Sequence, residues 1–233
     1  MKVGIMQPYF FPYIGYFQLI NACDYFIFLD NVQYIKKGWI NKNRVLINGQ
    51  PSYITIPVVK SPQRSLIRDK LIHPSVDIDK ILRKIRYGYK HRPHFAEAYR
   101  LLAPIFDGMG DSVARFSSES IMCLSEYIGL KTEFAFASEL MADSLNSKFG
   151  AEDRIIHLAH AVGGTEYVNM RGGQHLYDYG RFFSENIQLT FIDPHITKYP
   201  QPTNEFVPGL SIIDMLMNVP AEKANYFCQK SPQ

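Results

Sequence analysis

The sequence lacks the features that mark several common protein classes. Its three cysteines, Cys23, Cys123 and Cys228, are widely spaced and form no CxxC pair, which argues against a disulfide framework and a cysteine-based zinc site. No stretch approaches the ~18 uninterrupted apolar residues that a membrane-spanning helix needs. No long apolar run follows Met1, so no secretory leader is expected. These absences favour a protein of the reducing cytoplasm without a transmembrane segment.

Sequence motifs of several enzyme classes are also missing. The chain has no Walker phosphate-binding loop, no intact G-x-G-x-x-G fingerprint and no G-x-S-x-G nucleophile elbow. No cysteine lies in a recognisable nucleophile context. If the protein is an enzyme, direct attack by a bound acceptor therefore fits better than a covalent intermediate on the chain.

Core-forming residues are plentiful, and cations are concentrated in one segment. Hydrophobic residues make up 46% of the 233 residues, so a packed fold is expected rather than disorder. Between Lys36 and Arg92, 14 Lys and Arg residues stand against three Asp residues, a local charge of +11. Since the whole chain carries +3, the remainder carries about −8. This asymmetry suggests either an anionic ligand, such as a nucleotide, sugar phosphate or lipid phosphate, or a solvated face with helix ion pairs.

The amino-terminal segment alternates strand and helix. Residues 2–7 have the pattern of a buried strand, and the two prolines and one glycine of residues 8–16 make a shaped loop. Residues 16–23 suit a helix, and residues 25–29 suit a second strand. Strand, loop, helix and strand within ~30 residues form a βαβ unit, which builds parallel sheets.

The rest of the chain predicts the remaining elements. Residues 44–58 predict a hairpin around Asn48-Gly49, and residues 77–130 predict a helical insertion. Later patterns predict strands at 133–137, 167–170 and 188–192, and helices at 151–162, 174–183, 211–218 and 221–227. We therefore expect one α/β domain over residues 1–233, with a mainly parallel sheet, flanking helices, the hairpin and the insertion.

The first candidate site follows the first strand. In doubly wound α/β proteins, ligands bind beyond the carboxyl ends of the strands, often at a helix N-terminus. Gly15 allows close backbone approach of a ligand, and Gln7, Pro8 and Tyr16 flank it. The alternative is a turn that its prolines and glycine merely shape.

The second candidate site follows the second strand. The carboxylate of Asp30 is suited to orient an amine or hydroxyl nucleophile. Asp30 would also act as the base for that nucleophile if the pKa of the carboxylate were raised. The cations and amides behind it suit a phosphate or carboxylate, and the single tryptophan suits stacking on a sugar or base. The alternative is a capped turn with exposed lysines. The group consists of Asp30, Gln33, Tyr34, Lys36, Lys37, Trp39, Asn41 and Arg44.

The third candidate site lies in the last third of the chain. Asn169 ends a strand, and Arg171 with the two following glycines leads into a helix, so backbone N–H groups face an anion that Arg171 clamps. His175 and Asp178 are i, i+3 on one face of that expected helix. The alternative is a glycine-rich cap beside a surface ion pair.

The helix predicted at residues 151–162 raises the question of a metal site. Asp153, His157 and His160 fall at i, i+4 and i+7, a spacing that lets three ligands share one helix face. The segment lacks the H-E-x-x-H general base, and such histidines also pack as ordinary side chains. We therefore predict no metal.

Five motifs resemble those of a known family. They are residues 5–17 (IMQPYFFPYIGYF), 30–34 (DNVQY), 39–44 (WINKNR), 56–58 (IPV) and 209–214 (GLSIID). Together they resemble the WbqC-like family over essentially the whole chain. The resemblance implies a role in surface-polysaccharide (O-antigen, lipopolysaccharide) biosynthesis and, for some members, glycine (aminoacyl) transfer. It also implies that Ser211 and Asp214, in the last motif, bind substrate.

A more distant resemblance concerns the loop at residues 12–16. It stands where nucleotidylyltransferases and the amide-forming pantothenate synthetases carry an H-x-G-H loop that binds ATP, on a HUP-like parallel sheet. Both histidines are absent here, and the nearby Tyr13 and Tyr16 are not cations at neutral pH. The likeness implies nucleotide binding rather than histidine-assisted adenylyl transfer.

Three functional hypotheses follow. The first is a transferase or ligase that joins an acyl or aminoacyl (glycyl) group to the amine of a nucleotide- or lipid-linked amino sugar, with Asp30 and Tyr16 as catalytic residues. Its cofactor is open, a nucleotide or an activated acyl donor. The second is a non-catalytic binding or assembly protein for glycan precursors, and the third is a degenerate nucleotidylyltransferase. No nucleic-acid module is visible. All three hypotheses expect the Gly15 loop and the Asp30 segment to meet at one rim of the sheet.

Overall fold

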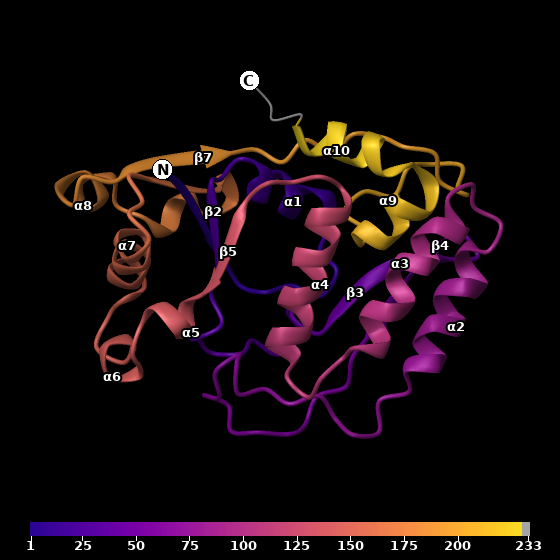
Figure 1. Ribbon diagram of the computed structural model, residues 1–233, viewed down its shortest axis with the longest axis horizontal. Coiled ribbons are helices and arrows are strands. Elements are labelled where there is room, and N and C mark those ends of the chain that lie inside the picture. The colour runs from indigo at the N-terminus through magenta and orange to yellow at the C-terminus, as the bar shows by residue number, and fades with distance from the viewer. Residues whose placement is uncertain (230–233) are drawn as a thin grey trace.

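A five-stranded parallel sheet forms the centre of the computed structural model, which describes residues 1–229 (Figure 1). The strand order is β5-β2-β1-β6-β7, so the chain builds outward from β1 on one side and then returns to the other. This confirms the predicted α/β class with a mainly parallel sheet. The strands are β1 (Lys2–Met6), β2 (Tyr25–Phe28), β5 (Glu133–Phe136), β6 (Glu166–Met170) and β7 (Gln188–Ile192).

Helices cover both faces of this sheet because side chains alternate along each strand. Phe26 and Phe28 of β2 face the larger core with α1 (Ile14–Asn21) and α10 (Ala221–Gln229). Ile27 between them faces a second core, where α5 (Ala137–Leu140), α7 (Ala151–Ala161) and α8 (Tyr179–Ser184) pack. In Figure 1 the sheet separates α7 from α1. The short α6 (Asp143–Asn146) lies between α5 and α7 in the chain.

The segment between β2 and β5 carries the hairpin and the helices predicted for the middle of the chain. Asn48 and Gly49 have φ angles of 52° and 73°, which is the left-handed pair that a type I′ turn requires. The helix α9 packs on α3 and on the hairpin, and so joins the carboxyl-terminal region to this segment. The elements are β3 (Lys42–Ile47), β4 (Gln50–Thr55), α2 (Ile78–Tyr89), α3 (Phe95–Asp107), α4 (Val113–Tyr127) and α9 (Ile212–Asn218).

Two predicted helices differ from those observed. The helix α1 begins at Ile14, before Gly15 rather than after it. The helix predicted over 174–183 is wrong. A 3-10 helix, η1 (Arg171–Leu176), is followed by α8, because the Asp178 carboxylate caps α8 by accepting from Gly180 N at 2.7 Å. His175 and Asp178 therefore do not share a helix face.

Gly88 marks the closest approach between α2 and the hairpin. A Cβ added there would lie 2.5 Å from the backbone oxygen of Leu46 and 2.8 Å from Ile47 Cδ1. We expect Gly88→Ala to lower the free energy of unfolding by about 2–3 kcal/mol, because a backbone oxygen cannot move aside. Urea denaturation measures this. Gly110→Ala is the matched control, since nothing lies within 4 Å of its added Cβ, and an equal loss in both variants would contradict the prediction.

Among residues 1–229, no helix has the length and apolar character needed to cross a membrane.

Candidate functional site

The loop after β1 is fastened to two distant segments. Phe10 N donates to Trp39 O at 2.8 Å, and Asn43 Nδ2 donates to Phe10 O at 3.0 Å and to Phe11 O at 2.8 Å. Ser211 Oγ also donates to Phe11 O, at 2.8 Å. The segments around residues 10, 40 and 210 therefore meet at the carboxyl end of β1, where open α/β sheets bind ligands.

This loop holds a strained residue. Phe11 has a φ of 41°, a left-handed conformation that a bulky side chain rarely adopts. Its ring is fully buried and stacks on Phe106 with centroids 5.2 Å apart. Such strain costs about 1–3 kcal/mol and persists only where the surroundings fix it, most often at functional sites. The fastening described above supplies that fixation.

An aromatic pocket of about 310 Å³ opens beside the strained loop. Arg44 lies at its edge, with its guanidinium 5.8 Å from the centre of the Trp39 ring and Nη2 3.4 Å from Gly209 O. The buried Nε of Arg44 has no hydrogen-bond partner among the described residues. The pocket is lined by Tyr9, Pro12, Tyr13, Trp39, Asn43 and Gly209.

A second pocket, of about 520 Å³, is lined by five lysines, and we call it the lysine pocket. None of its lining residues is acidic, and within residues 1–229 none of the five lysines has a carboxylate within 4.0 Å. Unpaired ammonium groups in one concave site attract anions. Its lining residues are Tyr34, Lys36, Lys37, Asn41, Lys42, Val58, Val59, Lys60, Ser61 and Lys70.

Lys70 is the buried member of the lysine pocket. It is only 5% exposed, and its Nζ donates to Val59 O at 2.7 Å and to Ser61 Oγ at 2.5 Å. Burial, with help from the charge of Lys36, lowers the pKa of Lys70. An anion in the pocket would oppose this lowering of the pKa, because its negative charge favours the protonated form of Lys70.

The two pockets share one stretch of chain. Trp39 lines the aromatic pocket, and Asn41 lines the lysine pocket. Asn41 is held by Tyr34, whose hydroxyl donates to Asn41 Oδ1 at 2.9 Å, and it donates to Ile56 O at 2.7 Å. Lys37 has a φ of 67°, so backbone strain occurs at both pockets.

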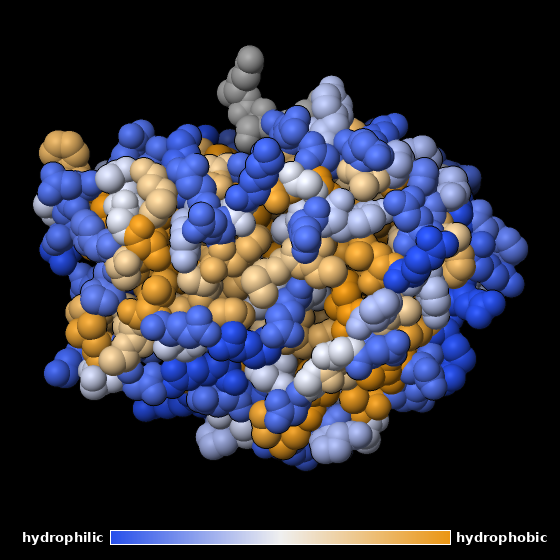
Figure 2. Space-filling view, viewed as in Figure 1, coloured by the Kyte–Doolittle hydropathy of each residue, from blue (hydrophilic) through white to orange (hydrophobic). Residues whose placement is uncertain are grey.

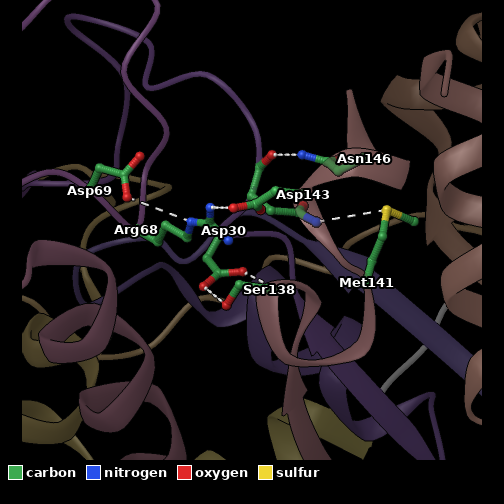
Figure 3. Close-up of polar contacts among 8 residues, drawn as sticks. Asp30, Arg68, Asp69, Ser138, Met141, Asp143 and Asn146 are labelled. Atoms are coloured by element: carbon green, nitrogen blue, oxygen red, sulfur yellow. Dashed lines mark hydrogen bonds and ion pairs between the residues drawn. The ribbon is translucent and has the colours of Figure 1, made fainter. Parts of the chain in front are cut away.

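Asp30, in the loop after β2, lines neither pocket, and its carboxylate points toward Ser138 of α5 (Figure 3). The residue is 2% exposed, and its carboxylate accepts from Ser138 N at 2.9 Å and Ser138 Oγ at 2.6 Å. Burial raises the pKa of Asp30, while these two hydrogen bonds oppose the rise. Arg68 is nearby but pairs with Asp143 at 2.6 Å. The catalytic role of Asp30 stays a prediction.

The residues predicted around Gly15 serve to shape the loop. Tyr16 is buried, and its hydroxyl donates to Gln7 O at 2.8 Å, while burial raises its pKa well above the usual value. A Cβ on Gly15 would collide with the ring of Tyr13, so this glycine makes room for a residue that lines the aromatic pocket. Pro8 is buried next to Gln7. Roles of these residues in binding or catalysis stay predictions.

Several of the other predicted site residues make hydrogen bonds or ion pairs within the protein. Gln33 Nε2 donates to Gln63 O at 2.9 Å. Asn169 is buried and donates to the hydroxyls of Tyr167, at 2.9 Å, and Tyr177, at 3.1 Å. Arg171 Nε lies 2.5 Å from Asp193 Oδ2, and His175 is exposed on η1. Their roles in binding a substrate also stay predictions.

Ser211 and Asp214 hold α9 in place. Ser211 caps the helix by accepting from Ile213 N at 3.3 Å, and its Oγ also donates to Phe11 O in the strained loop. Asp214 is fully buried and accepts from the hydroxyls of Tyr89 and Tyr199, each at 2.7 Å. The motif that contains them therefore supports the aromatic pocket from behind, through Gly209 in its wall.

The structure also assembles residues that the sequence analysis did not single out. Tyr9, Asn43 and Gly209 line the aromatic pocket, and Lys42, Lys60 and Lys70 complete the lysine pocket. The three lysines belong to the basic segment, and Tyr9, Asn43 and Gly209 lie in the quoted motifs, so these were the available signals. Asn43 lies two residues from the predicted Asn41, but nothing local indicates that it fastens the loop after β1.

No group of three or more His, Cys, Asp or Glu residues in the described part of the chain is placed to hold a metal ion. Asp153 pairs with Arg181 at 2.9 Å, and His157 packs against Phe149, with ring centroids 5.3 Å apart. His160 Nε2 lies 3.9 Å from Glu185. These contacts account for the three residues whose spacing raised the question of a metal.

Comparison with known proteins places the chain in a family. A sequence model described as the WbqC-like protein family matches residues 7–226. A protein of Mycobacterium tuberculosis (strain ATCC 25618 / H37Rv), named "Uncharacterized protein Rv1507c", is 31% identical over 235 residues, covering 98% of this chain and 99% of that protein. No solved structure matches. The chain belongs to the WbqC-like protein family, as its five motifs predicted.

Proposed function

We propose that this protein binds a phosphorylated, nucleotide- or lipid-linked sugar and acts as an acyl or aminoacyl transferase in surface-polysaccharide biosynthesis. The phosphates occupy the lysine pocket, and a ring of the ligand stacks in the aromatic pocket. The observation that carries the binding step is the convergence of five lysines without a carboxylate partner among residues 1–229. The transfer step rests on the family resemblance.

Phosphate is the group that this arrangement suits best. Charge-assisted hydrogen bonds from ammonium groups to phosphate are about twice as strong as neutral ones. Lys70 is buried and already oriented by Val59 O and Ser61 Oγ, so little side-chain freedom is lost when an anion binds. The neighbouring Trp39, Tyr9 and Tyr13 offer ring faces on which a sugar or base packs.

The proposed transfer needs an activated carboxyl group. The amine nitrogen of the sugar attacks the carbonyl carbon of the donor and forms the amide bond. The leaving group, a phosphate, thiolate or tRNA oxygen, departs with its electron pair, and the proton lost by the nitrogen passes to it or to water. The protein's contribution is to hold the acceptor in place, which by itself supplies a large part of many rate accelerations.

Fluorescence titration tests the binding step directly. Trp39 is the only tryptophan in the chain, and it lines the aromatic pocket. We expect a uridine diphosphate amino sugar to change its emission with saturation, and expect the free amino sugar to have no such effect. ATP, CTP and pyrophosphate form the comparison arms. Failure of every phosphorylated compound to bind at low salt would contradict the proposal.

A second candidate function, a non-catalytic binding protein for glycan precursors, is favoured by one observation. Asp30, the predicted base, lines neither pocket, and both of its carboxylate oxygens accept hydrogen bonds from Ser138. Within residues 1–229, no carboxylate lines either pocket. A site without a base binds a ligand as well as one that has it.

Asp30→Asn separates the two functions. We expect the affinity for the diphosphate sugar to stay within about twofold, since the substitution removes a charge that lies outside the pockets. Mass spectrometry of the amino-sugar nucleotide measures transfer, with the glycyl group supplied as free glycine together with ATP, as a glycyl thioester or as glycyl-tRNA. Loss of transfer with binding intact supports the transferase with Asp30 in its reaction. If neither the unaltered protein nor Asp30→Asn transfers a glycyl group, the result supports the binding protein. Asp107→Asn is the control, because Asp107 is exposed.

A further inference from the structure

The helix α2 carries a concentrated positive charge that the lysine pocket does not explain. Lys80, Arg83, Arg86 and Lys90 are exposed, and Lys84 is half-buried. Arg83 lies 3.6 Å from Asp77, but within residues 1–229 the other four have no carboxylate within 4.0 Å. We call these five residues with Tyr87 the α2 basic face. In Figure 2 hydrophilic residues cover the right-hand rim of the molecule, where α2 lies in Figure 1.

The spacing of these cations works against the helix itself. Lys80 and Lys84 are i, i+4, Arg83 and Arg86 are i, i+3, and Arg86 and Lys90 are i, i+4. Like charges at these spacings are neighbours on a helix surface and destabilise it. The opposite face of α2 anchors the helix through buried Ile81, Leu82 and Ile85, so its packing does not depend on the exposed Lys80, Arg86 and Lys90. An external anionic partner gives them a use.

Two exposed tyrosines lie among the cations. Tyr87 is 61% exposed and lies one turn after Arg83 and Lys84. Tyr53 of β4 is 49% exposed, and its backbone oxygen accepts from Lys84 Nζ at 2.6 Å. Tyrosine is enriched where a bilayer meets water, because its ring is apolar and its hydroxyl remains wet. An outer helix that carries cations and such rings suits an anionic surface.

The α2 basic face is continuous with the lysine pocket. Lys42, which lines that pocket, places its Nζ 4.8 Å from the centre of the Tyr53 ring. Tyr53 shares a shallow depression of about 330 Å³ with Lys80 and Lys84. The α2 basic face therefore lies beside the lysine pocket.

We propose that the α2 basic face, together with Tyr53, docks this protein on an anionic membrane surface. The electrostatic attraction of basic residues to anionic lipid acts within about a Debye length, so the exposed cations of α2 are the ones that contribute. This inference uses residues outside the two pockets and does not rest on the proposed function. Duplex nucleic acid is the competing polyanion, and the test includes it.

Vesicle flotation tests the docking. We expect the protein to float with phosphatidylcholine vesicles that contain phosphatidylglycerol, to remain behind with phosphatidylcholine alone, and to be released by salt. Arg86→Gln with Lys90→Gln should weaken binding roughly 20- to 30-fold, since each cation near the surface contributes a few-fold. Lys131→Gln with Lys198→Gln removes the same charge from exposed positions elsewhere and should leave binding within about twofold.

A tyrosine variant and a folding check complete the test of membrane docking. Tyr87→Ala should weaken binding without changing its salt dependence, because it removes ring burial rather than charge. Circular dichroism melting checks that the variants fold, and relief of like-charge contacts should keep their melting temperatures near that of the unaltered protein. Equal losses in the two double variants, equal flotation with neutral vesicles, or tighter binding to duplex DNA than to anionic vesicles would each overturn the proposal. Failure of nucleotide sugars to bind would leave it intact.

Discussion

Replacing Lys36 and Lys60 together with glutamate should lower the affinity for a diphosphate sugar by about a thousandfold. Each lysine lost removes a charge-assisted hydrogen bond of about 1.5–3 kcal/mol, and each tenfold in affinity corresponds to about 1.4 kcal/mol. The glutamates also repel the phosphates. Both lysines are exposed, so the fold has no need of them. Titration calorimetry or Trp39 emission measures the affinity.

The control for this prediction places the same charge change elsewhere. Lys131→Glu with Lys148→Glu alters two exposed lysines that line neither pocket, and it should reduce affinity only through weak long-range repulsion. Equal losses in both double variants would mean that overall charge, rather than the lysine pocket, binds the ligand.

Alkaline pH should weaken the same binding reversibly. Burial and the charge of Lys36 lower the pKa of Lys70, so Lys70 loses its proton before an ordinary lysine does. A ligand anion binds the protonated form, and affinity should therefore fall as the pH rises through this lowered pKa. Affinity that stays constant until the ordinary lysine range would exclude a contribution from Lys70.

Asp214→Ala should lower the free energy of unfolding by about 3–5 kcal/mol. The buried hydroxyls of Tyr89 and Tyr199 would each lose their acceptor, at about 1–3 kcal/mol for each unsatisfied group, and a cavity would remain. Gln201 Nε2, 3.0 Å from the carboxylate, keeps its second acceptor, Val207 O. Because Leu46 N donates to the Tyr89 hydroxyl at 2.7 Å, the change also reaches β3.

Urea denaturation of Asp214→Ala measures this loss. Asp107→Ala is the matched control, because Asp107 is exposed at the end of α3 and makes no ion pair within the described residues. We expect the control to change stability by less than about 0.5 kcal/mol. A loss below about 1 kcal/mol in Asp214→Ala would show that the hydrogen bonds from Tyr89, Tyr199 and Gln201 to Asp214 do not hold α9, α2 and β3 together.

Much of the fold could be predicted because its signals are short in range. The strand at 188–192 and the hairpin turn at Asn48-Gly49 match the prediction, since alternation and turn chemistry act within a few residues. The helix predicted at 174–183 was wrong although the deciding signal is also local, because Asp178 caps α8 and the helix therefore begins only at Tyr179.

The candidate site could be predicted only in part. The segments after β1 and β2 do meet, as their place after neighbouring parallel strands implied, and Phe10 bonds Trp39 directly. Gly15 packs under Tyr13, and Asp30 turns toward Ser138, and neither position has a local sequence signal. Asn43 fastens a loop more than 30 residues away, which requires knowledge of the chain's path.

By itself the sequence determined the parallel βαβ start, the hairpin and the basic character of residues 36–92, because periodicity and composition are properties of neighbouring residues. Only the tertiary structure decided which of those cations converge. Lys36 and Lys70 are 34 positions apart, yet they line one pocket because the chain folds back along Val58 and Val59. Charge becomes a binding site only when burial and geometry bring the groups together without their counter-ions, and that depends on long-range packing.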